Sequence, residues 1–133
     1  MDAIKIENLT KKYRDVVAVD NLCLSVRKGE LLSLLGVNGA GKTTTIKMLS
    51  SLTRPTSGDA FLNGKSICKD AAAVKTMIAV SPQETAVAAG LSVRENLELI
   101  CGIYGFSKER RGAIIAELSN LLGLKAVIGN KTG

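Results

Sequence analysis

The sequence predicts an α/β fold in which a buried strand leads through a glycine-rich loop into a helix. Residues 31–35 form an apolar run, the pattern of a strand that is covered on both faces in a parallel sheet. Residues 36–43 follow as a glycine-rich loop, and the apolar residues of the last third of the chain recur with a helical period. We therefore expect one domain of 133 residues, with a β-rich core over residues 1–90 and a helical part over residues 91–133.

A strand, and with it a hairpin, is expected at the start of the chain. Ile4, Ile6 and Leu9 alternate loosely with polar residues. A second β-rich stretch over residues 17–26 ends at the turn of residues 27–30. The central strand of residues 31–35 comes directly after this turn.

A short helix is expected after the glycine-rich loop. Its range is residues 43–52, because apolar side chains recur there at helical spacing until residues 54–58 break the pattern. The dipeptide Asn63-Gly64 then predicts a tight β-hairpin, since both residue types tolerate positive φ. A helical turn and a short apolar strand are expected next, over residues 70–75 and 77–80.

Two amphipathic helices are expected in the last third of the chain. Ser92 and Glu95 form a capping box at the start of the first, and the second starts near Ser107. The apolar faces consist of Val93, Leu97, Ile100, Cys101 and Tyr104 in the first helix and of Ile114, Ile115, Leu118, Leu121 and Leu122 in the second.

Composition excludes several classes of function. The chain has no histidine, so serine–histidine and cysteine–histidine catalysis and histidine-containing zinc sites are excluded. Its net charge of +6 favours anionic partners, but aromatic residues make up only 3%, which gives nucleic acid weak support. Three widely separated cysteines favour a reducing compartment, and the absence of a long apolar stretch or a leader pattern argues against secretion and membrane spanning.

The glycine-rich loop satisfies the pattern G-x-x-x-x-G-K-[ST] at every fixed position. Glycines let the backbone turn its N–H groups toward a phosphate, and the helix that begins at the end of the loop adds the positive end of its dipole. Lys42 would neutralise the β- and γ-phosphates, Thr43 would bind Mg²⁺, and Thr44 would donate toward the α-phosphate. The predicted fold class is therefore an α/β fold with a P-loop nucleoside triphosphate hydrolase core. The residues of the loop that we expect to bind the nucleotide are Gly36, Val37, Asn38, Gly39, Ala40, Gly41, Lys42, Thr43 and Thr44.

Several segments together resemble the nucleotide-binding domain of ATP-binding cassette (ABC) transporters. Asn38 and the second threonine, Thr44, are typical of that family's loop. Further matches follow in the family's order: a "P-T-S-G" tract at residues 55–58 that leads to Asn63-Gly64, a Q-loop at Val80-Ser81-Pro82-Gln83, and an "L-T-V-x-E-N-L" segment at residues 91–97.

The resemblance implies roles for further residues. Tyr13 is placed where the family stacks an aromatic ring on adenine, a role that needs only a flat π-face. Gln83 corresponds to the glutamine that orients Mg²⁺ and the attacking water, so Lys42 and Gln83 are the candidate catalytic residues, and Thr43 and Gln83 the candidate metal ligands. The implied cofactors are ATP and Mg²⁺.

The resemblance covers nearly the whole chain but only about the first half of the family's domain, so it implies an incomplete P-loop core with an antiparallel β subdomain and the start of a helical subdomain. The "L-S-G-G-Q" signature, the apolar strand that ends in Asp-Glu and the switch histidine do not occur in these 133 residues. Glu84, Glu95 and Glu98 are not expected to replace the catalytic base, because none of them ends a hydrophobic strand. The sequence therefore looks like an N-terminal or truncated part of an ABC ATPase, and we expect this chain alone to be inactive.

The leading functional hypothesis, implied by the resemblance of these motifs, is the ATP-binding subunit of an ABC transporter. The spacing and residues 98–105 are most similar to the multidrug or ABC-2 exporter type. The implied partners are a second ABC ATPase subunit, identical or different, and a transmembrane permease subunit, with no direct nucleic acid. The implied location is cytoplasmic, at the inner face of the cell membrane. One alternative is a non-transport ABC ATPase that acts on nucleic acid or ribosomes. Another is a soluble P-loop kinase, which the lack of an arginine-rich lid disfavours.

Overall fold

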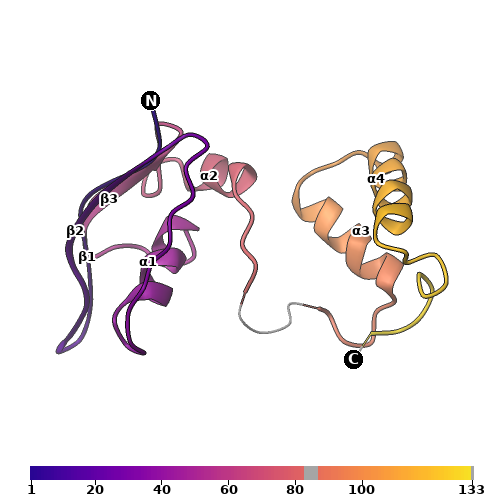
Figure 1. The fold of residues 1–133 in the computed structure, drawn as a ribbon, viewed down its shortest axis with the longest axis horizontal. Helices are drawn as coiled ribbons and strands as arrows, with labels where there is room; N and C mark the ends of the chain where they lie inside the picture. Colours follow the sequence, from indigo (N-terminus) through magenta and orange to yellow (C-terminus); the bar gives the residue numbers. More distant parts are fainter. Residues whose placement is uncertain (83–86, 133) are drawn as a thin grey trace. The chain divides into compact units, whose positions relative to one another are not determined.

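A computed structural model describes residues 1–82 and 87–132. The chain divides into two compact units, Met1–Val80 and Ser81–Gly133 (Figure 1). The first unit contains a sheet and two helices, and the second contains two helices.

The first unit is built on an antiparallel sheet with the strand order β2-β1-β3-β4. The bounds of the strands are Asp2–Tyr13 for β1, Val16–Arg27 for β2, Ser57–Leu62 for β3 and Lys65–Ser66 for β4. The first two form the expected hairpin, in which Tyr13 pairs with Val16 next to the turn. The central strand β1 also pairs with β3, where Ile6 faces Ala60. The prediction of a strand and a hairpin before residue 30 is confirmed.

The turn between β3 and β4 is the one predicted from Asn63-Gly64. Asn63 has a φ of 47° and Gly64 a φ of 80°, so both residues occupy the left-handed region that a two-residue hairpin turn requires. The strands pair directly beside the turn, Leu62 with Lys65.

Two helices cover one face of the sheet (Figure 1). They are α1, Lys42–Leu49, and α2, Ala71–Met77. The first ends earlier than the expected residue 52, because Ser51 adopts a φ of 56°, which a continuing right-handed helix does not allow. The core between the sheet and the helices consists of Ile6, Leu9, Val19, Met48, Ala60, Leu62, Ile67 and Val74.

Two predicted strands are wrong. Residues 31–35 form neither strand nor helix, and Leu31 and Leu35 are 95% and 92% exposed. Residues 77–80 form no strand either, because α2 continues through Met77. A strand needs hydrogen bonds to a neighbour, and the described residues pair no partner with either segment. Apolar composition alone therefore does not make these segments strands.

The second unit contains α3, Val93–Ile103, and α4, Lys108–Leu121. Ser92 and Glu95 form the predicted capping box: the Ser92 N–H donates to Glu95 Oε2 over 2.6 Å, and the Glu95 N–H donates to Ser92 Oγ over 3.1 Å. Ser107 caps α4, as expected. The segment after α4 returns to the start of α3, where the Val93 N–H donates to the carbonyl oxygen of Asn130.

The predicted apolar faces of these helices are only partly buried. Cys101 and Ile115 are buried, whereas Leu121 and Leu122 are 75% and 62% exposed. Tyr104 lies at the C-cap of α3 rather than within the helix. Among the residues that the structure describes, no helix combines the length and the apolar composition needed to cross a bilayer.

Candidate nucleotide-binding site

The glycine-rich loop connects the extended residues 31–35 to the first turn of α1. The Ala40 N–H donates to the carbonyl oxygen of Val37 over 3.1 Å, which closes a turn inside the loop. Gly39 and Gly41 have φ values of 84° and 89°, a region that residues with a side chain rarely occupy. The backbone conformation itself therefore favours glycine at these two positions of the loop.

Gly41 holds the end of the loop against β2. A Cβ atom on Gly41 would lie 2.2 Å from the carbonyl oxygen of Ala18 and 3.2 Å from a methyl group of Val19. The carbonyl oxygen of Gly41 accepts from both the N–H and the hydroxyl of Thr45, each over 2.9 Å. Sequence reasoning missed Ala18, Val19 and Thr45 as supports of the loop, because nothing in the sequence indicates which strand lies behind it.

The ammonium group of Lys42 turns back over the loop. Its Nζ donates to the carbonyl oxygens of Gly36 and Val37, the latter over 3.2 Å. No acidic residue lies in the first turn of α1. The positive end of the helix dipole and the Lys42 charge thus stand at the same loop without a carboxylate of that turn to neutralise them, which is the electrostatic requirement for binding an anion.

The two threonines after Lys42 lie in the first turn of α1. Thr43 is exposed and Thr44 is half-buried, and neither hydroxyl has a hydrogen-bond partner within residues 1–82 and 87–132. The same described residues contain no group of three or more histidine, cysteine or acidic side chains that would hold a metal ion alone. A threonine hydroxyl together with phosphate oxygens is a donor set that suits Mg²⁺, so the residues present fit a magnesium-bound triphosphate.

Tyr13 lies at the end of β1, beside the turn to β2. The residue is 46% exposed, and Lys11 Nζ lies 5.1 Å from the ring centre. The β1–β2 turn and the loop before α1 lie at the same end of the first unit, at the bottom of Figure 1. An exposed ring at this end is accessible to a planar base.

The other sequence-predicted site residues lie elsewhere. Gln83 and Glu84 lie outside the described residues. Glu95 accepts a hydrogen bond in the capping box of α3, and Glu98 is exposed on the same helix. Both lie in α3, so neither ends a strand, as the sequence predicts.

A pocket of about 270 Å³ lies between the glycine-rich loop and β2. It is lined by Ala18, Val19, Asp20, Leu22, Leu34, Leu35, Ala40, Gly41, Lys42 and Thr45. Leu34 and Leu35, which belong to the apolar run, thus border the site without being packed in a sheet. The pocket extends from the exposed apolar run to the Lys42 side chain.

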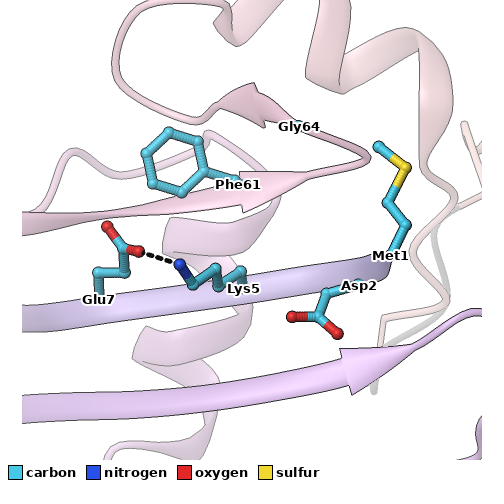
Figure 2. A pocket seen from close by; sticks show the side chains of 6 residues that line it. All are labelled: Met1, Asp2, Lys5, Glu7, Phe61 and Gly64. Carbon is cyan, nitrogen blue, oxygen red and sulfur yellow. Dashed lines mark ion pairs between the residues drawn. The ribbon is translucent and has the colours of Figure 1, made fainter.

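A second hollow, on the outer face of the sheet, contains no predicted site residue. Figure 2 shows its lining residues Met1, Asp2, Lys5, Glu7, Phe61 and Gly64. Lys5 Nζ and Glu7 Oε1 form an ion pair over 2.6 Å, and the hydrogen bond to Glu7 raises the pKa of Lys5. Lys5 and Glu7 neutralise each other, and the remaining charged side chain of the lining is the carboxylate of Asp2, which would repel a phosphate.

Comparisons with a family model, with curated proteins and with solved structures point to the same family. The family model described as "ABC transporter" matches residues 19–132. The chain is 48% identical to ATP-binding cassette sub-family A member 2 of Rattus norvegicus over 109 residues, which is 78% of this chain and 4% of that protein. It is 40% identical to the doxorubicin resistance ATP-binding protein DrrA of Mycobacterium tuberculosis over 118 residues, which is 87% of this chain and 36% of that protein.

A solved structure, the dimeric structure of a bacterial ABC transporter cassette, matches with a TM-score of 0.79 and 25% identity, over 96% of this chain and 61% of that one. The predicted fold class is confirmed by this match. The chain spans only about a third or less of the length of these two curated relatives. Because the family model covers residues 19–132 and the P-loop geometry is in place, the chain belongs to the ABC transporter family, within its ATP-binding domain.

Proposed function

We propose that this chain binds ATP with Mg²⁺ through the loop of residues 36–44. The observation that supports this most is the position of Lys42, whose ammonium group lies over the loop carbonyls at the N-terminus of α1. The Lys42 ammonium group and the positive end of the α1 dipole meet at the same loop of backbone N–H groups. This arrangement suits a polyphosphate, which carries several negative charges close together.

Each loop residue has a role that its position supports. The Lys42 ammonium moves from the carbonyl oxygens of Gly36 and Val37 to the β- and γ-phosphate oxygens, which are the stronger acceptors because they are ionised. The exposed hydroxyl of Thr43 takes part in holding Mg²⁺, which when bound neutralises developing phosphate charge. Thr44 donates toward the α-phosphate. Tyr13 stacks on the adenine, and Gln83 orients the metal ion and the attacking water.

In the intact protein we propose that ATP hydrolysis energises transport across a membrane, in the direction of export. The family match supports a transporter, and the name of the relative DrrA refers to doxorubicin resistance. A second ATP-binding subunit and a permease subunit are the proposed partners, and the matched bacterial cassette is dimeric. The proposed location is the cytoplasmic side of the cell membrane. The comparisons do not favour the ribosome-acting or kinase alternatives.

The proposal is tested by measuring ATP binding to wild type and Lys42→Ala. Charge-assisted hydrogen bonds contribute roughly 1.5–3 kcal/mol each, so we expect Lys42→Ala to weaken Mg-ATP binding by about tenfold or more. Equilibrium dialysis with labelled ATP measures this even if the protein associates. Lys47→Ala, an exposed lysine in the last turn of the same helix, is the matched control and should bind as wild type does. Equal affinity of wild type and Lys42→Ala would falsify the proposal.

A further inference from the structure

A pocket in the second unit has features that the ATP-binding role does not use. Its volume is about 330 Å³, within the range of pockets that take small molecules. Helix α4, the segment that follows it and the start of α3 form its walls. The lining residues are Arg94, Gly112, Ile115, Ala116, Ser119, Asn120, Lys125 and Ile128.

One lining residue is a buried hydroxyl without a partner. Ser119 is only 6% exposed, and its Oγ has no hydrogen-bond partner among the described residues. A serine inside a helix commonly donates to the carbonyl oxygen four residues earlier, and Ser50 at the C-cap of α1 donates to Ile46 in the same way. Ser119 makes no such bond. Buried polar groups in folded proteins are nearly always satisfied, so an acceptor supplied by a ligand would complete this one.

Two cationic side chains line the same pocket. Arg94 and Lys125 are both exposed, and neither forms an ion pair within the described part of the chain. The lining includes no carboxylate. Glu95, next to Arg94, is engaged in the capping box. The pocket therefore has two uncompensated positive charges beside one unsatisfied hydroxyl.

The elements that carry these groups are tied together. The Arg94 N–H donates to the carbonyl oxygen of Ile128 over 2.9 Å, which joins the first turn of α3 to the segment after α4. Lys125 and Ser119 lie on either side of the end of α4, where the Leu124 N–H donates to the carbonyl oxygen of Ser119 over 2.8 Å. The backbone segments that carry the basic residues are thus joined by hydrogen bonds, so binding does not have to bring these segments together.

We propose that this pocket binds a small organic oxyanion. The planar guanidinium of Arg94 pairs with a carboxylate or a phosphate through two parallel hydrogen bonds, and Lys125 adds a second positive charge. The Ser119 hydroxyl donates to the same anion. Ile115, Ala116 and Ile128 offer an apolar wall to the rest of the ligand. The site is separate in sequence from the ATP-binding loop and does not depend on it.

The test uses the full chain carrying Lys42→Ala, so that the ATP-binding loop contributes little. Equilibrium dialysis compares three probes: phenyl phosphate, benzoate and inorganic phosphate. We expect phenyl phosphate or benzoate to bind at least several-fold more tightly than inorganic phosphate, because only the first two reach the apolar wall. The preferred one of the two identifies the anionic group. Failure of all three probes to bind at millimolar concentration would overturn the proposal.

Variants then assign the binding to this pocket. Arg94→Gln and Lys125→Gln should each weaken binding about tenfold, the size expected for one charge-assisted hydrogen bond. Arg110→Gln, which removes an exposed charge outside the pocket, should leave it unchanged. Ser119→Ala should weaken binding while leaving the thermal stability equal or higher, since it removes an unsatisfied hydroxyl. Unchanged binding in both charge variants, or an equal loss in Arg110→Gln, would refute the assignment.

Discussion

Gly39 and Gly41 have nearly the same backbone conformation but different surroundings. Their φ values are 84° and 89°, yet a Cβ on Gly39 would meet nothing within 4 Å, whereas one on Gly41 would lie 2.2 Å from the carbonyl oxygen of Ala18. The pair separates the conformational requirement for glycine from the steric one. The sequence does not show that only one of these two glycines packs closely against another segment. The position of β2 in the structure shows that it is Gly41.

The glycine pair gives a prediction at the residue scale. Gly39→Ala should cost about 1–2 kcal/mol of folding free energy, the price of a left-handed residue with a side chain. Gly41→Ala should cost roughly 1–3 kcal/mol more, because the loop or β2 must also move. Urea denaturation followed by circular dichroism measures both. Equal destabilisation by the two substitutions would show that Gly41 does not contact β2 as described.

At the scale of single elements, the N-terminal caps of α3 and α4 differ in the number and length of their hydrogen bonds. Ser92 and Glu95 satisfy two backbone N–H groups reciprocally, over 2.6 Å and 3.1 Å. Ser107 accepts one N–H, that of Arg110, over 3.3 Å. The sequence pattern S-x-x-E predicts the first arrangement directly, since it specifies both partners at fixed spacing.

The unequal caps predict unequal effects of the same substitution. Ser92→Ala should destabilise α3 by about 1 kcal/mol, and Ser107→Ala should destabilise α4 by less, because its hydrogen bond is longer. Amide hydrogen exchange followed by mass spectrometry reports each helix separately. The prediction fails if exchange in α4 after Ser107→Ala accelerates as much as exchange in α3 after Ser92→Ala.

At the scale of the whole molecule, the described residues bring only part of an ATPase site together. The P-loop is complete, but the 133 residues contain no acidic residue at the end of an apolar strand and no "L-S-G-G-Q" segment. A water molecule must be oriented or deprotonated for hydrolysis. Of the groups expected to act on this water, only Gln83 occurs in this chain.

We therefore predict that the 133-residue chain binds ATP without hydrolysing it steadily. Phosphate release by the purified chain should not exceed that of Lys42→Ala under the same conditions. Turnover well above this control, and removed by Lys42→Ala, would mean that the residues present form a working site.

The exposed apolar residues predict that the isolated chain associates in solution or unfolds over a broad temperature range. Leu31 and Leu35 in the first unit are 95% and 92% exposed, and Leu121 and Leu122 in the second are 75% and 62% exposed. Exposed apolar segments with unpaired backbone groups favour association, in a system whose stability is normally only about 5–15 kcal/mol. Light scattering should show association or a broad thermal transition. A monodisperse monomer with one sharp transition, in the absence of nucleotide, would contradict this.

The sequence by itself determined the local features of this protein. The P-loop, the Asn63-Gly64 turn and the capping box at Ser92 were predictable, because each depends on residue types at short, fixed spacing. The β1–β2 hairpin and the helices α1, α3 and α4 follow from local apolar patterns. The family resemblance rests on the same short motifs, and the match over residues 19–132 agrees with it.

The tertiary structure decided what depends on distant partners. Residues 31–35 have the composition of a buried strand, but a strand forms only where another backbone supplies its hydrogen bonds, and the described residues supply none. The support of the P-loop by Ala18, and the gathering of Arg94, Ser119 and Lys125 around one pocket, depend likewise on contacts between segments far apart in the chain. Short-range residue patterns contain no information about these contacts, because packing rather than spacing brings the segments together.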